Sequence, residues 1–420
     1  MVGKPTCTPR LSRRALLGAG AAGVTATTAG CLGGGSASFD AWTPPPETWP
    51  LARYDPRNRN HNPNAAPPRD GVETAWESQT DVDVWTLVVA NGRVVAAGDE
   101  GLAVLDDDRG TIDERDPVPA QAAGFGPRDE YGRRPLYAAT VLGYRVDTAI
   151  AALRDRRYGG AGGSTTFWRT YETAGGEAIH LVTGADGVYV GHMGGPLVAA
   201  AADDGSERWR KRGAVPALTD GRLLAGEYSA LRAYEPRSGL DARLTGGPAE
   251  TWRQRGGHEA PVISDGRVFA GRRAGMGSEE PSLFGHDAAT GERLWEPRSL
   301  GTSASSPAVV GDTGYVGVSR ENDDGITQSG ALVALDLTDG TTRWRRDWSA
   351  GVGDPVAGGN GVVVAQGGQP DTEADRLRAY DAESGEPLWT HDAPDPIDAV
   401  ALVQSTVFVG SRDGRVAALR

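Results

Sequence analysis

Few residues in this chain of 420 are spaced as catalytic or metal-binding groups are. His286 directly precedes an aspartate in a repeated turn, which favours a structural hydrogen bond over catalysis. Ser305 stands where a nucleophile elbow around Ser303 needs its second glycine, which argues against a serine hydrolase. The six histidines lack metal-ligand spacing: His61, His180, His192, His258, His286 and His391.

Charged runs suggest two further kinds of site. The acidic runs at 106–108, 321–325 and 371–375 carry oxygen atoms suited to Ca²⁺, but none has the alternating ligands of a twelve-residue calcium loop. We interpret them as solvated loop tips. The basic run at 208–212 could contact anionic lipid or an acidic partner. Because it flanks a tryptophan at a strand end, we interpret it as a solvated edge.

Composition narrows the class of protein. Glycine supplies 60 residues and proline 27, and so many turn formers argue against a helical fold. The net charge of −13 argues against general nucleic-acid binding. Lys4 and Lys211 are the only lysines, so 41 of the 43 basic residues are arginine. This acidic, lysine-poor balance is typical of halophilic archaea, and high genomic GC content has the same effect.

The N-terminal residues carry the pattern of an export signal. Arg13 and Arg14 precede a weakly apolar run of small residues, as in a twin-arginine signal. The apolar run at 15–29 falls short of the roughly 20 residues needed to span a bilayer. Cys31 ends a stretch that looks like a lipobox, which predicts lipidation and anchoring at the outer face of the cytoplasmic membrane. The alternative is cleavage nearby that leaves a free thiol.

The cysteines and prolines suggest where the folded domain begins. The two cysteines, Cys7 and Cys31, both precede residue 32, so the rest of the chain has no disulfide, cysteine-based zinc site or thiol nucleophile. We predict an export signal at 1–30, a lipid-anchor tether and Pro/Asn-rich linker at 31–72, and a folded domain at 73–420. The aromatic stretch at 49–55 is expected to pack onto that domain.

A repeat of roughly 45 residues fills the predicted domain. Each unit has an Asp-Gly or Asn-Gly turn, two apolar strands, a turn of the form Asp-x-x-Thr/Ser-Gly, and a strand that ends in Trp. The Asp can cap backbone amides, the Gly is free to adopt a positive φ, and the Trp can fill the wedge between sheets. The clearest turns are Asp287, Gly291 and Trp295; Asp336, Gly340 and Trp344; and Asp381, Gly385 and Trp389.

Such units predict an all-β fold, a β-propeller of four-stranded antiparallel blades. Eight first-strand cores can be counted, and the last unit lacks its Trp strand where the sequence stops. The segment at 74–78 can supply that strand and close the ring. We therefore predict eight blades closed by an N-terminal strand, with seven blades as the alternative.

The Asp-x-x-Thr-Gly-x-x-x-Trp turn resembles the tryptophan-docking motif of PQQ-like β-propellers. That family includes quinone-dependent dehydrogenases and the propeller lipoprotein of the bacterial outer-membrane assembly machine. The resemblance implies that an enzyme of this family would bind PQQ and Ca²⁺ over the ring axis, with an aspartate base and a disulfide between adjacent cysteines. This chain has no adjacent cysteines, and no aspartate can be matched to that base.

The sequence thus favours a non-catalytic scaffold at the cell surface, without nucleic acid. Its alternative is a PQQ- and calcium-dependent dehydrogenase of alcohols or sugars. The longest loops within the units, at 272–282, 319–330 and 366–376, all join the same pair of strands. We expect them on one face, where this rim would bind a protein partner or a glycan.

Overall fold

The computed structural model describes residues 39–117, 119–128, 134–142, 147–154, 165–173, 177–227, 229–237, 247–256, 259–272, 282–321, 327–368 and 375–420. The chain divides into two units, Met1–Gly35 and Ser36–Arg420. Arg13, Arg14 and Cys31 lie outside the described residues, so their predicted roles stay predictions. Within the described ranges there are strands and turns and no helix, and hence no helix that could cross a membrane.

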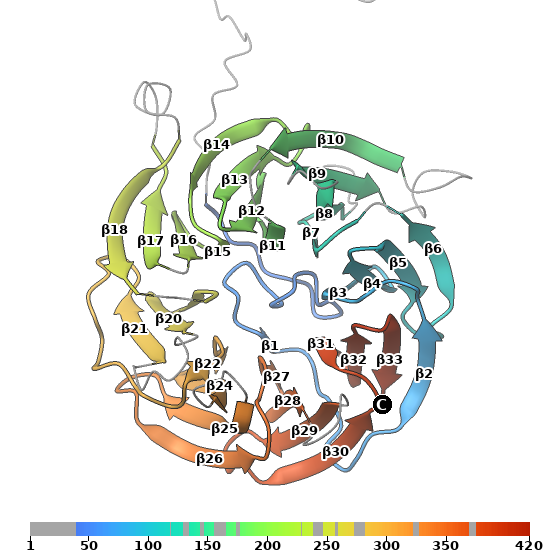
Figure 1. The fold of residues 1–420 in the computed structure, drawn as a ribbon, viewed down its shortest axis with the longest axis vertical. Coiled ribbons are helices and arrows are strands. Elements are labelled where there is room, and N and C mark those ends of the chain that lie inside the picture. Colours follow the sequence, from blue (N-terminus) through green and yellow to red (C-terminus); the bar gives the residue numbers. More distant parts are fainter. Residues whose placement is uncertain are drawn as a thin grey trace, which may run out of the picture. The chain divides into compact units, whose positions relative to one another are not determined.

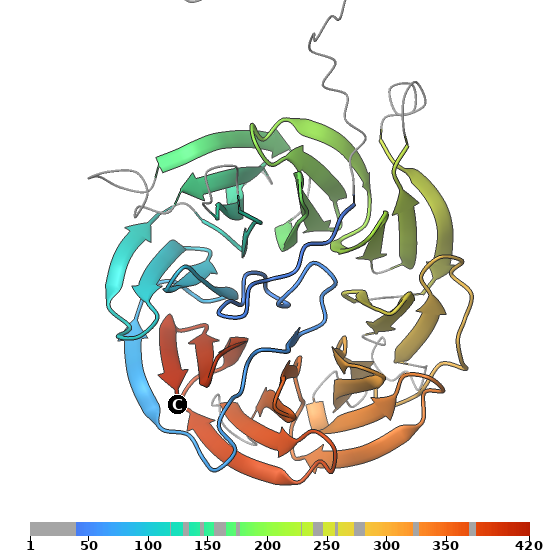
Figure 2. The same ribbon diagram turned by 180° about the vertical axis from the view of Figure 1, so that it is seen from behind.

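The strands of the second unit are arranged radially around a central axis (Figures 1 and 2). The first four sheets are built from β3 (Thr86–Ala90), β4 (Arg93–Gly98), β5 (Gly101–Asp106) and β6 (Ile112–Asp116); β7 (Ala122–Phe125), β8 (Leu136–Leu142), β9 (Asp147–Arg154) and β10 (Thr165–Thr173); β11 (Glu177–Thr183), β12 (Gly187–Met193), β13 (Pro196–Ala201) and β14 (Glu207–Arg212); and β15 (Val215–Thr219), β16 (Arg222–Glu227), β17 (Ala230–Glu235) and β18 (Ala249–Arg255).

The ring continues with three sheets and ends beside its start. These sheets are built from β19 (Val262–Ser264), β20 (Arg267–Gly271) and β21 (Leu283–Asp287); β22 (Ser303–Ala304), β23 (Ala308–Val310), β24 (Thr313–Glu321), β25 (Thr327–Asp336) and β26 (Thr342–Trp348); and β27 (Val356–Gly358), β28 (Val362–Gly368), β29 (Asp375–Asp381) and β30 (Pro387–Ala393). The last sheet combines β31 (Ile397–Val403), β32 (Thr406–Ser411) and β33 (Arg415–Leu419) with β2 (Thr74–Gln79).

The pattern of apolar residues explains the layers of each sheet. Inner strands such as β3 are apolar runs whose every residue is buried, because neighbouring sheets cover both faces. Outer strands such as β26 are mostly half-buried or exposed, and only Trp344 and Trp348 of β26 are buried. The core therefore consists of apolar clusters wedged between adjacent sheets. In six sheets an alanine of the third strand lies opposite the tryptophan: Ala152 and Trp168, Ala199 and Trp209, Ala233 and Trp252, Ala334 and Trp344, Ala379 and Trp389, and Ala418 and Trp76.

The predicted closure by an N-terminal strand is confirmed. β2 pairs antiparallel with β33, and Glu77 lies opposite Ala417. Trp76 is buried, and its ring centroid lies 6.0 Å from that of Phe408 in β32. The first and last parts of the domain therefore share one sheet, which leaves no open edge at that point of the ring.

The all-β propeller of mostly four-stranded antiparallel sheets is confirmed, and one sheet departs from this pattern. Seven sheets have four or more strands, whereas the sheet of β19–β21 has three. The segment around Trp295 makes only isolated bridges, from Arg293 to His286 and from Arg298 to Leu283. Pro297 lies two residues after Trp295. Because proline has no N–H to donate, it interrupts the hydrogen bonds that a regular fourth strand would need.

The prediction of a tether for 31–72 needs correction from Phe39 onward. Phe39, Trp49 and Tyr54 are all buried. The short strand β1 (His61–Asn62) pairs in parallel with β27, and Figures 1 and 2 both show the preceding segment crossing the centre of the ring. We call residues 48–66 the central segment. It belongs to the propeller despite its linker-like proline and asparagine content.

Candidate functional site

The repeated turns are organised by their aspartates. The Asp287 Oδ1 atom accepts hydrogen bonds from the amides of Ala289 and Thr290, at 2.9 and 2.8 Å. Asp381 caps its own turn in the same way, with Ser384 N at 2.9 Å. A hydrogen bond from Arg69 and the capped amide together lower the pKa of Asp381 to about 2. Each turn is therefore held by a charged cap within a few residues of sequence.

Trp344 and Trp295 each contact the glycine of the next sheet's turn. A Cβ atom added to Gly385 would lie 2.6 Å from the Trp344 ring, and the Trp344 Nε1 atom donates to Ala382 O at 3.0 Å. Trp295 makes the same pair of contacts with Gly340 and Leu337 O. Trp389 differs, because its Nε1 atom donates to Pro68 O at 2.7 Å. The structure thus places the predicted turn residues at the joints between sheets, away from the ring axis.

The central segment hydrogen-bonds to inner strands around the ring. Its backbone carbonyls accept from inner-strand amides, and Trp49 exchanges two hydrogen bonds with Val89 of β3. The other backbone pairs, donor first, are Phe125 and Pro50, Leu218 and Pro56, Ile263 and Arg57, Val309 and Arg59, Ala357 and Asn60, and Ala66 and Gln404. A segment bonded to so many sheets fixes their inner edges relative to one another.

Asn58 joins three sheets at the centre. Its Nδ2 atom donates to Pro216 O at 2.9 Å and to Pro261 O at 3.1 Å. Its Oδ1 atom therefore faces His180 Nε2, at 3.1 Å, and the neutral imidazole must donate through that nitrogen. Burial of His180, together with the nearby charge of Arg53, lowers its pKa to about 3. His180 is thus a neutral structural donor, not a proton carrier near neutral pH.

A funnel of about 1340 Å³ opens along the axis above the central segment. Ala52, Arg53 and Asn60 of that segment contribute to its lining. Its wall is formed where inner strands begin, as at Val215, and where second strands end, as at Gln366. The predicted rim loops follow the same strand ends, so their attachment points lie on the funnel side. Most of the residues in these loops lie outside the described ranges.

The floor of the funnel is charged but paired. Arg53 forms an ion pair with Asp354, which lies just before β27. The Arg53 side chain is 11 % exposed, so its charge is largely removed from water. Below it, the buried Asp55 pairs with Arg59 at 2.7 Å and accepts from the amide of Arg57. These pairs hold the floor in place and leave the mouth of the funnel as its more accessible part.

An exposed tryptophan is held rigidly at the mouth. Trp85 is 44 % exposed, and its Nε1 atom donates to Asp83 Oδ2 at 2.7 Å. The Arg412 guanidinium lies 4.8 Å from the centre of its ring and is itself held by two 3.0 Å hydrogen bonds to Asp398. Met193, also in the funnel wall, is 59 % exposed. Ordered aromatic side chains of this kind serve as anchors in recognition.

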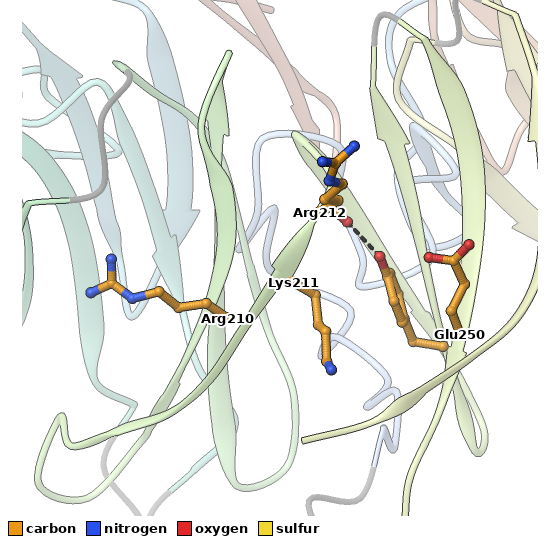
Figure 3. A pocket seen from close by; sticks show the side chains of 5 residues that line it. Arg210, Lys211, Arg212 and Glu250 are labelled. Atoms are coloured by element: carbon orange, nitrogen blue, oxygen red, sulfur yellow. Dashed lines mark hydrogen bonds between the residues drawn. The ribbon is translucent and has the colours of Figure 1, made fainter. Parts of the chain in front are cut away.

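A smaller pocket of about 350 Å³ lies between β14 and the next sheet. Arg210, Lys211, Arg212, Tyr234 and Glu250 line it, and Lys211 and Arg212 also line the funnel. Figure 3 shows the three consecutive basic residues on one strand and Glu250 on its neighbour, with a hydrogen bond from Tyr234 to Arg212 O at 2.8 Å. Arg210 and Lys211 are half-buried and Arg212 is exposed, so the basic run lies at a partly solvated edge and also lines this pocket.

The other residues that the sequence singled out, in the first acidic run and at His286, make hydrogen bonds to nearby backbone groups. The Asp106 Oδ1 atom of the first acidic run accepts from the amides of Asp108 and Arg109, so this run begins with a turn cap. His286 is buried, with Nδ1 3.2 Å from Gly291 O. Sequence reasoning missed Arg53 and Trp85, and it considered His180 only as one of six histidines without metal-ligand spacing. Trp85 alone left a signal, because it is a tryptophan outside the repeat position.

A radial all-β domain with docked tryptophans defines the class of PQQ-like β-propellers. The model of the family described as outer membrane protein assembly factor BamB matches residues 156–327 and 285–420, which is more than half of the chain. The chain belongs to this family. BamB of Bordetella pertussis (strain Tohama I) is 27 % identical over 139 residues, and the alignment spans 32 % of this chain and 32 % of that protein.

Solved structures share the fold at low sequence identity. BamB from Moraxella catarrhalis superposes with a TM-score of 0.58 at 16 % identity, over 83 % of this chain and 99 % of that one. A quinohemoprotein alcohol dehydrogenase from Pseudomonas putida HK5 gives 0.60 at 13 % identity, over 89 % and 80 %. The fold is therefore shared by BamB and by an alcohol dehydrogenase, so the fold alone does not assign activity.

Proposed function

We propose that this chain is an exported, lipid-anchored β-propeller that binds a protein partner across its funnel face and catalyses no reaction. The observation that carries the proposal is Trp85, an exposed ring at the funnel mouth held by Asp83 and Arg412. An ordered, exposed aromatic side chain loses little conformational entropy on binding, which suits recognition. Arg13, Arg14 and Cys31 support export and anchoring, and the membership of the BamB family supports a protein partner.

The alternative function is a PQQ- and calcium-dependent dehydrogenase, which would need a calcium site in the funnel. A calcium ion beside the quinone requires several oxygen ligands. In the part of the chain that the structure describes, no group of three or more His, Cys, Asp or Glu side chains could hold a metal ion. The scaffold role predicts no joint shift of the melting temperature with PQQ and Ca²⁺, whereas a shift would favour the dehydrogenase.

Paired surface variants test the scaffold role. The double variant Trp85→Ala/Met193→Ser removes two exposed apolar side chains from the funnel, and Leu294→Ser removes one that does not line it. After chemical crosslinking in the producing cells, we expect the double variant to retain less than a tenth of the partner captured by wild type. Leu294→Ser should retain it all. Equal capture by the double variant would contradict the proposal, and loss of a bound glycan instead would reassign the ligand.

A further inference from the structure

The strongest unexplained feature is a cationic corner on a protein whose net charge is −13. We define this corner as Met193, Lys211 and Arg212. All three residues line the funnel, and the two basic ones also line the pocket between β14 and the next sheet. The corner therefore joins the two cavities. Figure 3 shows the Lys211 side chain extending beside the pocket, with Arg210 directed away from it.

The carboxylates around the corner already have partners. Arg232 binds Glu250 at 3.0 Å and Glu227 at 2.8 Å, and its own side chain is only 3 % exposed. Glu207 is held by Arg210 at 2.8 Å. Among the described residues, neither the Lys211 ammonium nor the Arg212 guanidinium forms an ion pair. Two positive charges at the edge of a concave site therefore lack an ion-pair partner within the described ranges.

Apolar surface adjoins these charges. Met193 ends β12, and the paired strand places Pro196 opposite Arg212 and Leu197 opposite Lys211. The Met193 side chain is 59 % exposed, and its flexible thioether adapts to varied apolar shapes. The corner therefore offers one apolar contact beside two cationic ones. All three residues also line the funnel, which a segment of protein chain can enter and a flat membrane surface cannot, and this favours a peptide over a lipid surface.

We propose that the corner binds an extended acidic segment of the partner protein, in which carboxylates flank an apolar side chain. The carboxylates would contact Lys211 and Arg212, and the apolar side chain would contact Met193. This inference rests on the proposed function, because it names the chemistry of the partner on the funnel face. Binding should weaken as salt rises, since both cations are solvent-accessible.

The first experiment uses the purified full chain and a fluorescent Asp-Glu-Leu-Asp-Glu-Leu-Asp-Glu peptide. Anisotropy should show binding that weakens at least tenfold in the Lys211→Glu and Arg212→Glu variants. The matched control is Arg253→Glu, which reverses one exposed charge on β18 outside both pockets. A peptide with Arg in place of each acid should not bind. No binding of the acidic peptide, or an equal loss in Arg253→Glu, would overturn the inference.

Lys211 also permits a direct contact test, because it is the only lysine after residue 4. A carbodiimide should join its amine to a carboxylate of the bound peptide as an amide. The Lys211→Arg variant keeps the charge, so it should bind the peptide within about threefold of wild type and form no such adduct at position 211. A crosslink at wild-type level in Lys211→Arg would overturn the inference.

Two further outcomes separate this inference from its alternatives. If Lys211→Glu abolishes binding to phosphatidylglycerol vesicles while the peptide does not bind at all, the corner is a lipid site and the inference fails. If Trp85→Ala/Met193→Ser loses the cellular partner but Lys211→Glu/Arg212→Glu keeps it, the proposed function stands and the inference fails. Loss of partner and peptide together in the charge-reversal variants, with Arg253→Glu unaffected, supports it.

Discussion

At the turn between β29 and β30, Gly385 has a φ of +70°, and an added Cβ atom would overlap the Trp344 ring. Gly361 in the same sheet has a φ of +75° but open space around it, apart from one Arg69 atom at 4.0 Å. The two glycines share a backbone conformation and differ in their contact with tryptophan. They therefore separate the cost of backbone strain from the cost of displacing the ring.

We predict that Gly385→Ala lowers the free energy of unfolding by about 3 kcal/mol and Gly361→Ala by about 1 kcal/mol. Both variants lose stability because alanine disfavours the left-handed backbone conformation. Gly385→Ala loses more because its Cβ atom must displace the Trp344 ring. Urea denaturation followed by tryptophan fluorescence measures both. Equal losses would show that the ring moves freely and that the docking contact contributes little.

His180 makes a prediction about pH. Its folded pKa of about 3 lies below the ordinary 6.5, so between these values the unfolded chain binds the extra proton. Stability should therefore be full above pH 6.5 and fall as pH decreases toward 3, with a slope approaching 1.4 kcal/mol per pH unit. His180→Gln keeps an N–H donor and should flatten this slope between pH 4.5 and 6.5. An unchanged slope in the variant would assign the acid sensitivity to other groups, such as His61.

At the scale of elements, the central segment adds hydrogen bonds at the hub to the packing of its buried Trp49 and Tyr54 side chains. Asn58 and Asn91 both have a φ of 59°, but Asn58 Nδ2 binds two carbonyls, whereas Asn91 Nδ2 has no partner among the described residues. Replacing either residue by alanine imposes the same backbone strain. Only the change at Asn58 leaves buried carbonyls and His180 without a partner.

We predict that Asn58→Ala destabilises the fold by about 3 kcal/mol more than Asn91→Ala. Hydrogen exchange should also accelerate at Leu218 and Ile263, whose amides donate to the central segment beside Asn58. Thermal melts and exchange rates on the two variants make the comparison. If both variants behave alike, the central segment lies on the ring without holding its sheets together.

The sequence predicts elements that depend on contacts between neighbouring residues better than elements that depend on contacts between residues far apart in the chain. Asp287 caps amides two and three residues away, so the turn chemistry is visible in any one repeat. The closure by β2 follows from counting strands. The contacts of Asn58 to Pro216 and Pro261 span 158 and 203 residues, and no local pattern encodes them. The proline and asparagine of the central segment instead give it the composition of a linker.

At the scale of the whole molecule, these features give the two sides of the ring different roles. The central segment crosses the axis and contributes Ala52, Arg53 and Asn60 to the lining of the funnel, and a ligand would bind on the side that the funnel opens to. That side carries Trp85 and the cationic corner. The repeat pattern specifies none of the residues that form them. The repeats form the sheets of the ring, and residues outside the repeat pattern determine the chemistry of the funnel lining.

Site-specific photocrosslinking tests the central claim, partner binding at the funnel face, most directly. A photoreactive amino acid would replace Met193 in one full-length variant and Leu294 in another, since both native side chains are exposed. On irradiation of intact cells, we predict a discrete adduct of increased mass from position 193 and none from position 294. No adduct from position 193, or the same adduct from both positions, would contradict a partner bound at the funnel.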